Sequence, residues 1–394
     1  MTALEIRASV SLASIFALRL LGLFLILPVF AVYAQSIPGG TDATLVGVAL
    51  GIYGLTQGLL QIPYGVASDR WGRKPVIAAG LVVFAAGSFV AAFATDIAWT
   101  IAGRAIQGAG AISAAVTAFI ADSTREVHRT KAMALVGGSV ALTFAGSLVL
   151  APVLYPLIGV RGLFGMTGVL VVAAIGVLLW VVPDAPAAAA KADDRSSTGA
   201  VLFDRQLLRL NVGIFFLHMV LMTMFVVIPI LLVQGGLPLS EHWKVYLPTV
   251  LVSFALMAVP LVAAERRGMM RPLFICSIVL VLVAQLGFML SGETIFWMAI
   301  MLLIFFTGFN ILEASLPSLV SRLAPASAKG LALGIYNTAQ ALGLFAGGAL
   351  GGAIVARWGL KAVFVFAAVV MASWWLIALG MREVPVKAGE PLPI

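Results

Sequence analysis

The chain has 394 residues, of which 62% are hydrophobic and 10% are charged, and its formal net charge is +8. Soluble globular proteins carry roughly 25% charged residues, so this composition excludes an ordinary soluble domain and predicts an integral membrane protein. In such a chain an excess of Lys and Arg marks membrane orientation. We therefore expect the lipid bilayer as a partner and no nucleic acid.

The first apolar run, 10–33, is too long for a signal-peptide core of roughly 7–15 residues and carries Arg19 in its middle. We therefore expect it to be an uncleaved first helix. Apolar runs between charged or Gly/Pro-rich breaks predict twelve spanning helices in an all-α integral membrane fold. The expected spans are 10–33, 44–67, 76–95, 97–121, 131–156, 162–182, 206–233, 244–264, 272–290, 294–321, 329–355 and 360–381.

Residues 183–205 have the composition of a linker, with two prolines, four successive alanines and several Asp and Ser residues. We predict a cytoplasmic linker here, between an N-terminal six-helix half (1–182) and a C-terminal six-helix half with a short tail (206–394). With both ends cytoplasmic, 18 of the 24 Lys and Arg residues lie on the inner side and four on the outer side. This asymmetry favours twelve helices with N-in, C-in topology.

The two halves repeat each other in sequence. The recurring segments are Asp69–Gly72 as Glu265–Gly268, Lys131–Leu135 as Lys329–Leu333, and Gly108 as Gly308. Three matches across the linker indicate duplicated halves, an architecture that places a substrate site between the halves near the membrane midplane. Carriers that work by alternating access use this architecture, whereas a channel does not require it.

The functional groups of an enzyme are not gathered anywhere in the sequence. A single cysteine, Cys276, excludes an intrachain disulfide and a thiolate metal cluster, and we expect it to pack in the core. Three scattered histidines and one carboxylate at depth do not supply a catalytic or metal-binding cluster. We expect no enzyme activity, no metal and no cofactor.

The segment Gly65–Lys74 concentrates charge between two apolar runs. Asp69 lies near a helix C-terminus, where a carboxylate is unfavourable unless a cation answers it; Arg73 is the expected cation and Asp122 a second acceptor. Glycine would allow close helix approach at Gly65 and a tight reversal at Gly72. The candidate residues of this cytoplasmic latch are Gly65, Asp69, Arg70, Gly72, Arg73, Lys74 and Asp122. The alternative is that the segment is an orientation signal alone.

Three charges are expected at depth in the bilayer, where each costs roughly 2.5–3.5 kcal/mol on insertion scales. Arg104 is expected to bond backbone groups or Gln57 as an interhelical tie. Glu313 is the one acidic residue deep in the membrane, and burial favours the neutral form of a carboxyl group, so we predict that it exchanges a proton. Arg19 is its expected counter-charge; a structural tie is the alternative for Arg19.

Several motifs resemble those of the major facilitator superfamily. Gly65-x-x-x-Asp69-Arg70-x-Gly72-Arg73-Lys74 resembles the loop signature between its second and third helices, and Arg104-x-x-Gln107-Gly108 resembles its fourth-helix motif. Gly146–Gly159 resembles the fifth-helix antiporter motif, although Ala151 stands where that motif prefers glycine. Gly308–Glu313 resembles the tenth helix of YajR-type bacterial inner-membrane transporters. Those transporters carry a small soluble C-terminal domain, which we expect this chain to lack.

The resemblance implies a central cavity lined by the first, second, tenth and eleventh helices, and a cavity histidine at His218. Histidine ordinarily changes charge near neutral pH, so His218 is a second candidate for proton coupling; a satisfied core group is the alternative. A wall of amide and phenol groups suits an amphiphilic solute, although interhelical hydrogen bonding is an alternative role for these side chains. The candidate cavity residues are Arg19, Tyr33, Tyr53, Gln57, Gln61, Arg104, Asn310, Tyr336, Asn337 and Gln340.

We therefore expect a secondary active transporter of the bacterial inner (plasma) membrane that works by alternating access as a monomer. The expected activity is proton-coupled export of small amphiphilic or drug-like molecules. A metabolite or sugar symporter or uniporter is the alternative within transport. A channel is disfavoured by the duplicated halves and by the lack of a charged ring.

Overall fold

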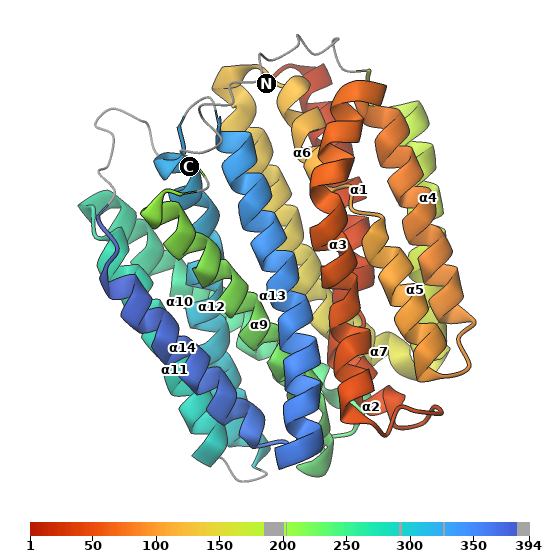
Figure 1. Cartoon of the computed structure of the whole chain (residues 1–394), viewed down its shortest axis with the longest axis vertical. Coiled ribbons are helices and arrows are strands. Elements are labelled where there is room, and N and C mark those ends of the chain that lie inside the picture. Colours follow the sequence, from red (N-terminus) through yellow and green to blue (C-terminus); the bar gives the residue numbers. More distant parts are fainter. Residues whose placement is uncertain (185–200, 202, 291–293, 326–327, 384–394) are drawn as a thin grey trace. The chain divides into compact units, whose positions relative to one another are not determined.

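A computed structural model of the chain describes residues 1–184, 201, 203–290, 294–325 and 328–383. Every regular element among these residues is a helix, and eleven of the helices are long and apolar enough to span a membrane. The chain divides into two compact units, Met1–Asp193 and Asp194–Ile394, which are drawn from red to yellow and from green to blue in Figure 1. Most of the predicted linker, 183–205, lies outside the described residues.

The N-terminal unit is a bundle in which α7 packs against α1 and α4, and α5 packs against α3 and α4. Its elements are α1 (Ala3–Phe24), α2 (Leu27–Ala34), α3 (Ala43–Trp71), α4 (Arg73–Ala92), α5 (Ile97–Ala109), α6 (Ser113–Asp122), α7 (Glu126–Gly176) and the five-residue π-helix η1 (Val177–Val181).

The first helix begins at Ala3, seven residues before the predicted start, because a capping box closes its end. The Thr2 hydroxyl accepts from Glu5 N at 3.2 Å, and Glu5 Oε2 accepts from Thr2 N at 2.6 Å. Two of the amide groups that a helix N-terminus leaves unpaired are satisfied in this way. Apolar composition alone misses such a start, whereas the Thr-x-x-Glu spacing predicts it.

Two of the predicted spans are interrupted. The first divides into α1 and α2 around Leu25 and Ile26, directly before Pro28, which occupies the first turn of α2. The fourth divides into α5 and α6 at Gly110–Ile112. A broken helix inside a membrane leaves backbone groups that other parts of the protein must satisfy.

The structure has eleven candidate spans where the sequence predicts twelve, and the difference arises in α7. The expected fifth and sixth spans, 131–156 and 162–182, form one continuous candidate span, Lys131–Val181. Within it Gly159 is non-helical, with φ +62° and ψ 178°, a backbone conformation that glycine adopts most readily. Gly159 therefore separates two helical segments at the place where the sequence predicts a turn.

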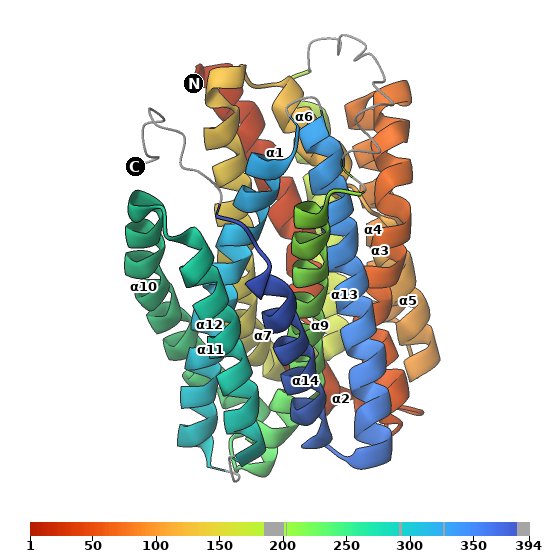
Figure 2. The ribbon, with the colours of Figure 1, turned by 60° about the vertical axis from the view of Figure 1, so that its left-hand side comes forward.

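The C-terminal unit pairs α9 with α13, and α11 with both α12 and α14, while α10 packs against α12. Figures 1 and 2 both show α9 and α13 side by side. The elements are α9 (Arg205–Gln234), the 3-10 helix η2 (Leu239–Glu241), α10 (Trp243–Arg267), α11 (Met270–Leu290), α12 (Ile295–Leu323), α13 (Lys329–Trp358) and α14 (Ala362–Leu379).

Glycines on α13 allow its close approach to α9. A Cβ atom built on Gly343 would lie 2.3 Å from the Phe215 carbonyl oxygen, and one on Gly347 would lie 2.2 Å from that of Met219. Gly351, one turn further on, contacts the same helix. No other residue type fits at these distances, so the glycines set the spacing between the two helices.

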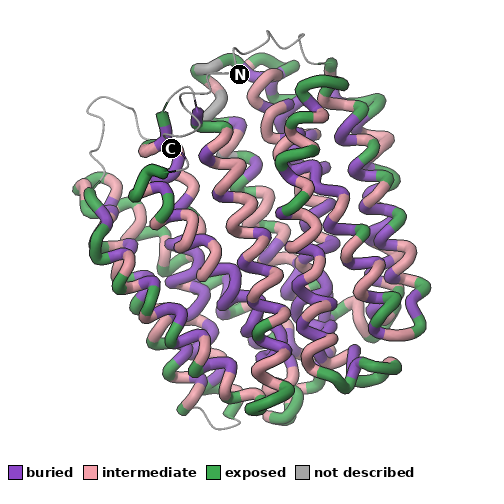
Figure 3. The backbone as a smooth tube through the Cα atoms, in the orientation of Figure 1, coloured by how far each residue is buried: buried purple, intermediate pink, exposed green. Residues whose placement is uncertain are grey.

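Cys276 is exposed on α11, so the expectation that it packs in the core is wrong. Buried and exposed positions alternate along the helices (Figure 3), and on α11 the buried ones include Phe274, Ser277, Ile278 and Val281. This three- and four-residue spacing defines one packed face. Cys276 lies outside that face.

Candidate functional site

The loop between α3 and α4 holds Arg73 in a network of oxygen acceptors. Its Nη1 lies 2.5 Å from Asp69 Oδ1 and 2.7 Å from Ser68 Oγ, and its Nε donates to Asp122 Oδ2 at 2.9 Å. Gly72, between the two helices, has φ +93°. Arg73 thus joins the end of α3 to the end of α6, with the two acidic partners that the sequence predicts.

The two carboxylates around Arg73 differ in exposure. The Asp69 side chain is 65% exposed, whereas those of Asp122 and Arg73 are 19% and 13% exposed. Solvent screens an exposed ion pair strongly, and such pairs contribute about 0–1 kcal/mol. The Arg73–Asp122 contact is therefore the stronger part of this cluster.

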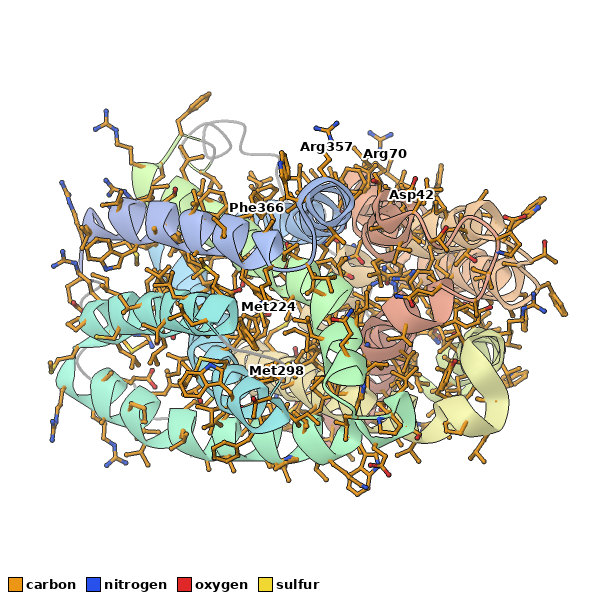
Figure 4. All side chains as sticks on the ribbon, turned by 90° about the horizontal axis from the view of Figure 1, so that it is seen from below. Asp42, Arg70, Met224, Met298, Arg357 and Phe366 are labelled. Carbon is orange, nitrogen blue, oxygen red and sulfur yellow. The ribbon has the colours of Figure 1, made fainter. Side chains whose placement is uncertain are left out.

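The other residues of the loop lie apart from the Arg73 network. Lys74 Nζ contacts Asp184 Oδ1 at 2.6 Å, and the exposed Arg70 extends outward from the end of α3 (Figure 4). A Cβ built on Gly65 would lie 3.6 Å from Ala114 Cβ, an ordinary van der Waals contact. An alanine would fit at this position, so the contact between α3 and α6 does not require a glycine at Gly65.

Arg19 is completely buried in the N-terminal unit, where hydrogen bonds satisfy each nitrogen of its guanidinium. Nε donates to the Gly110 carbonyl at 3.0 Å, Nη1 to Ser113 Oγ at 3.0 Å, and Nη2 to Gln57 Oε1 at 3.2 Å. Gly110 and Ser113 flank the break between α5 and α6. The guanidinium of Arg19 thus pairs with a backbone carbonyl that the break leaves without a helical partner, and the break supplies acceptors for the buried charge.

Arg104 is also buried and acts as an interhelical tie, as one reading of the sequence predicts. Its Nη1 donates to the Gly22 carbonyl of α1 at 3.3 Å and to Gln107 Oε1 at 3.0 Å. The guanidinium groups of Arg104 and Arg19 lie 4.9 and 5.6 Å from the ring centre of Tyr53. Two cation–π contacts therefore share one buried ring, whose hydroxyl has no hydrogen-bond partner.

Three of the predicted cavity residues have different surroundings. Gln61 is buried with no hydrogen-bond partner for its amide, and Tyr33 is partly exposed on α2 beside the Phe30 ring. Asn310 Nδ2 donates to Ser253 Oγ at 2.9 Å, so Asn310 ties α12 to α10. A cavity lined by all ten residues stays a prediction, because they belong to two units.

Glu313, His218 and Gln340 come together inside the C-terminal unit, from α12, α9 and α13. Gln340 Nε2 lies 2.8 Å from His218 Nε2 and donates to Glu313 Oε1 at 3.2 Å. His218 Nε2 and Glu313 Oε2 are 3.7 Å apart. Both residues of the predicted proton site are therefore present in one cluster, and Gln340 joins them.

The cluster has both apolar and polar neighbours. The Phe309 ring lies 5.8 Å from the His218 ring, and α14 carries no ionisable side chain. Tyr336 lies one turn before Gln340 on α13, and its buried hydroxyl has no hydrogen-bond partner; neighbouring Asn337 is partly exposed. Arg19 belongs to the other unit, so its pairing with Glu313 stays a prediction.

A second ion pair occupies the equivalent loop of the C-terminal unit. Arg322 Nη2 donates to Glu265 Oε1 at 2.7 Å. Glu265 is the repeat counterpart of Asp69, and the 200-residue shift that relates Gly308 to Gly108 relates Arg322 to Asp122. The internal repeat could have revealed this pair. The residue at the helix end, however, is acidic in the N-terminal copy (Asp122) and basic in the C-terminal copy (Arg322), so the repeat does not conserve its charge.

Sequence reasoning also missed a tie between α1 and α7. Glu5 Oε1 accepts from Arg125 N at 3.0 Å and from Arg125 Nε at 2.9 Å. The hydrogen bond to this carboxylate raises the pKa of the Arg125 guanidinium. The capping-box spacing marks Glu5 as structured, but no local signal links it to a residue 120 positions away.

A small cavity lies within the C-terminal unit. It is lined by Met224, Phe225, Ile228, Tyr246, Leu302, Phe305 and Phe306. Figure 4 labels Met224 on α9 and Met298 on the neighbouring α12. The Tyr246 hydroxyl is the one polar side-chain group in the lining, and it has no hydrogen-bond partner. Among the described residues, no group of His, Cys, Asp and Glu could hold a metal ion.

The chain is similar to known transporters along its whole length. The profile of the Major Facilitator Superfamily matches residues 12–348 and 264–393. Inner membrane transport protein YajR of Escherichia coli (strain K12) is 43% identical over 389 residues, 98% of this chain and 85% of the relative. Multidrug resistance protein MdtH of Aeromonas hydrophila is 27% identical over 347 residues, 86% of this chain and 85% of the relative.

Solved structures show the same fold. A bacterial homologue of the human lysosomal transporter Spinster, in an inward-facing and occupied conformation, aligns with a TM-score of 0.78 and 12% identity, covering 96% of this chain and 97% of that one. The predicted resemblance to the superfamily is confirmed by the profile match and by the 43% identity to YajR. The chain belongs to the major facilitator superfamily and is an inner-membrane, multi-pass transporter rather than an enzyme.

Proposed function

We propose that this protein is a proton-coupled secondary transporter that exports small amphiphilic or drug-like molecules by alternating access. The observation that carries the proposal is the Glu313–Gln340–His218 cluster, a carboxyl group and an imidazole joined by an amide inside the C-terminal unit. Ionisable groups within spanning segments are costly and mark ion or proton pathways. The 27% identity to a protein named for multidrug resistance supports the substrate class.

The proposed topology has twelve crossings with both chain ends in the cytoplasm, and the working unit is a monomer. Support comes from the non-helical Gly159, which lets the two segments of α7 cross the bilayer separately. Counting them as two crossings places the loops of the Arg73 cluster and the Glu265–Arg322 pair on the same side, where basic residues are concentrated.

The proton cycle follows from the charge of the cluster. With a carboxylate and a neutral imidazole the cluster carries one negative charge, and one bound proton makes it neutral. A neutral cluster costs less to enclose in an apolar interior than a charged one. The protonated cluster therefore favours a state that encloses it, and the deprotonated cluster favours a state in which water reaches it. This difference couples proton binding to opening on one side of the membrane.

The cytoplasmic latch in this scheme is Arg73 with Asp69 and Asp122. It stabilises the outward-facing state and breaks when the halves rock. Its contacts to two helix ends make the segment rigid in one state, and its partly exposed carboxylates allow it to open.

A flux measurement tests the proposal. The purified protein is reconstituted in proteoliposomes with an imposed pH gradient, and ethidium, a fluorescent amphiphilic cation, is the first probe. We expect gradient-driven accumulation that is abolished by Glu313→Gln and retained in Gln285→Leu, a buried glutamine of α11 outside the cluster. Ethidium flux that occurs without the gradient and is unchanged by it would instead support uniport.

A ligand screen at two pH values finds further probes. A ligand that binds the folded protein raises its melting temperature by mass action. A proton-coupled exporter should show stabilisation by its ligands that differs between the two pH values. Glu313→Gln should remove that difference while the stabilisation itself remains.

A further inference from the structure

Gln340 occupies the one nitrogen of His218 that could accept a proton. His218 Nδ1 lies 3.3 Å from the Ile214 carbonyl oxygen. A carbonyl oxygen only accepts hydrogen bonds, so Nδ1 carries the hydrogen in this contact. In a neutral imidazole the other nitrogen, Nε2, is then an acceptor, and the Gln340 amide group 2.8 Å away donates to it.

The same amide group holds one oxygen of Glu313. Its nitrogen carries two hydrogens, which is enough to donate to His218 Nε2 and to Glu313 Oε1 at once. Glu313 Oε2 has no hydrogen-bond partner. The Glu313 side chain is 33% exposed, whereas that of His218 is 8% exposed. Glu313 Oε2 is thus a buried acceptor of the cluster without a hydrogen-bond partner, and it belongs to the more exposed of the two residues.

The two sites for a proton are therefore unequal. A proton that adds to Glu313 Oε2 forms an O–H bond, changes the cluster charge from −1 to 0, and leaves both amide contacts intact. A proton that adds to His218 Nε2 would face the hydrogen of the amide. The amide would then have to turn over, which would place its oxygen against the Glu313 carboxylate.

We propose that Gln340 is the positioning residue that keeps His218 neutral and directs the transported proton to Oε2 of Glu313. This inference rests on the proposed proton coupling and assigns its two candidate groups different roles. Glu313 binds the proton, while His218 orients the amide through its fixed tautomer. Among the described residues of α13, Tyr336 is the ionisable side chain one turn from Gln340 on the same face. The neighbouring α14, which packs against α9, carries none.

The close packing of α9 and α13 supports this role. Gly343 lies one turn after Gln340 and touches the α9 backbone at Phe215, three residues before His218. The backbones are therefore held in contact beside the cluster. This backbone contact fixes the distance between α9 and α13 next to Gln340 and His218, and so keeps the amide within hydrogen-bonding distance of the imidazole.

The test is nitrogen NMR of the full chain in lipid nanodiscs, with ¹⁵N-labelled histidine. The chain has three histidines, and His218→Gln identifies the signals of His218. We expect His218 in the wild type to keep a proton on Nδ1 and none on Nε2 as the pH falls from about 8 to about 5, the range in which free histidine becomes charged. In Gln340→Leu the freed Nε2 should become protonated within that range.

Two further variants complete the experiment. Gln340→Met keeps the side-chain length without the amide and should behave like Gln340→Leu, which covers the case in which leucine impairs folding. Gln285→Leu is the matched control and should leave the His218 signals unchanged. A wild-type His218 that carries its proton on Nε2, or becomes doubly protonated across this range, overturns the proposal. So does an unchanged His218 spectrum in both Gln340 variants.

The outcome is separable from that of the proposed function, because the spectra require neither substrate nor flux. If the histidine signals behave as expected but Glu313→Gln does not alter gradient-driven transport, only the proposed function fails. If Glu313→Gln abolishes that transport but the Gln340 variants leave His218 unchanged, only this inference fails.

Discussion

Gly347 of α13 lies so close to Met219 of α9 that a Cβ atom on the glycine would stand 2.2 Å from the methionine carbonyl oxygen. We predict that Gly347→Ala forces the two helices apart and destabilises the C-terminal unit by about 1–3 kcal/mol, the usual cost of overpacking. The matched control is Gly334→Ala, on the same helix, where a Cβ meets nothing within 4 Å. Thermal unfolding in detergent compares the two; equal melting temperatures would contradict the assignment.

Arg19→Lys should destabilise the N-terminal unit more than Ser113→Ala does. The lysine keeps the buried charge but loses the planar fork that reaches Gly110, Ser113 and Gln57 together. Ser113→Ala removes a single partner and should cost about 1–3 kcal/mol, because it leaves one donor unsatisfied. Unfolding midpoints of both variants provide the measurement, and an Arg19→Lys protein as stable as the wild type would refute the argument.

Asp122→Asn should shift the balance between inward- and outward-facing states more than Asp69→Asn. Both carboxylates contact Arg73, but Asp69 is 65% exposed and Asp122 is 19% exposed, so solvent screens the first pair more strongly. Cys276 is the one cysteine of the chain, so a Cys276→Ser background allows spin labels to be placed in pairs across the cytoplasmic side.

Distances between such labels report the populations. Gly65→Ala is the control from the same loop and should leave them unchanged, since its contact with Ala114 is ordinary. A larger shift for Asp69→Asn than for Asp122→Asn would reverse the ranking.

Glu265 and Arg322 should tolerate exchange of their charges. Each single reversal, Glu265→Arg or Arg322→Glu, places like charges where the structure has a 2.7 Å contact. The double variant restores an attractive pair. Because both side chains are about one-third exposed, the coupling measured by a double-mutant cycle should be at most about 1 kcal/mol. A coupling of zero would mean that the contact does not contribute to stability.

The sequence predicts functional residues best where a residue type is costly in its surroundings and so needs a specific partner or role. The charge density at Gly65–Lys74 and the cost of a deep carboxylate led directly to Arg73 and Glu313. The break between the expected spans 131–156 and 162–182 is predicted because apolar runs end on both sides of it, and Gly159 lies within it.

Other features depend on contacts between segments far apart in the chain. Gln340 was expected to line a cavity, and only its position between α9 and α12 shows that it joins His218 to Glu313. The break at Gly110 could not be predicted, because the residue that pairs with the Gly110 carbonyl is Arg19, 91 residues earlier. The exposure of Cys276 differs from the expectation because a lone cysteine does not specify its neighbours.

The opposite charges of Asp122 and Arg322 bear on how the duplicated halves diverged. In the N-terminal copy two acids face each other and a bridging cation, Arg73, must lie between them. In the C-terminal copy the helix end is itself basic, and the position equivalent to Arg73 is Met269. An arginine at position 269, in place of the methionine, would stand next to the basic Arg322 and repel it. With Met269 at this position, Glu265 and Arg322 pair directly, so the C-terminal copy joins its two helix ends with two residues where the N-terminal copy uses three.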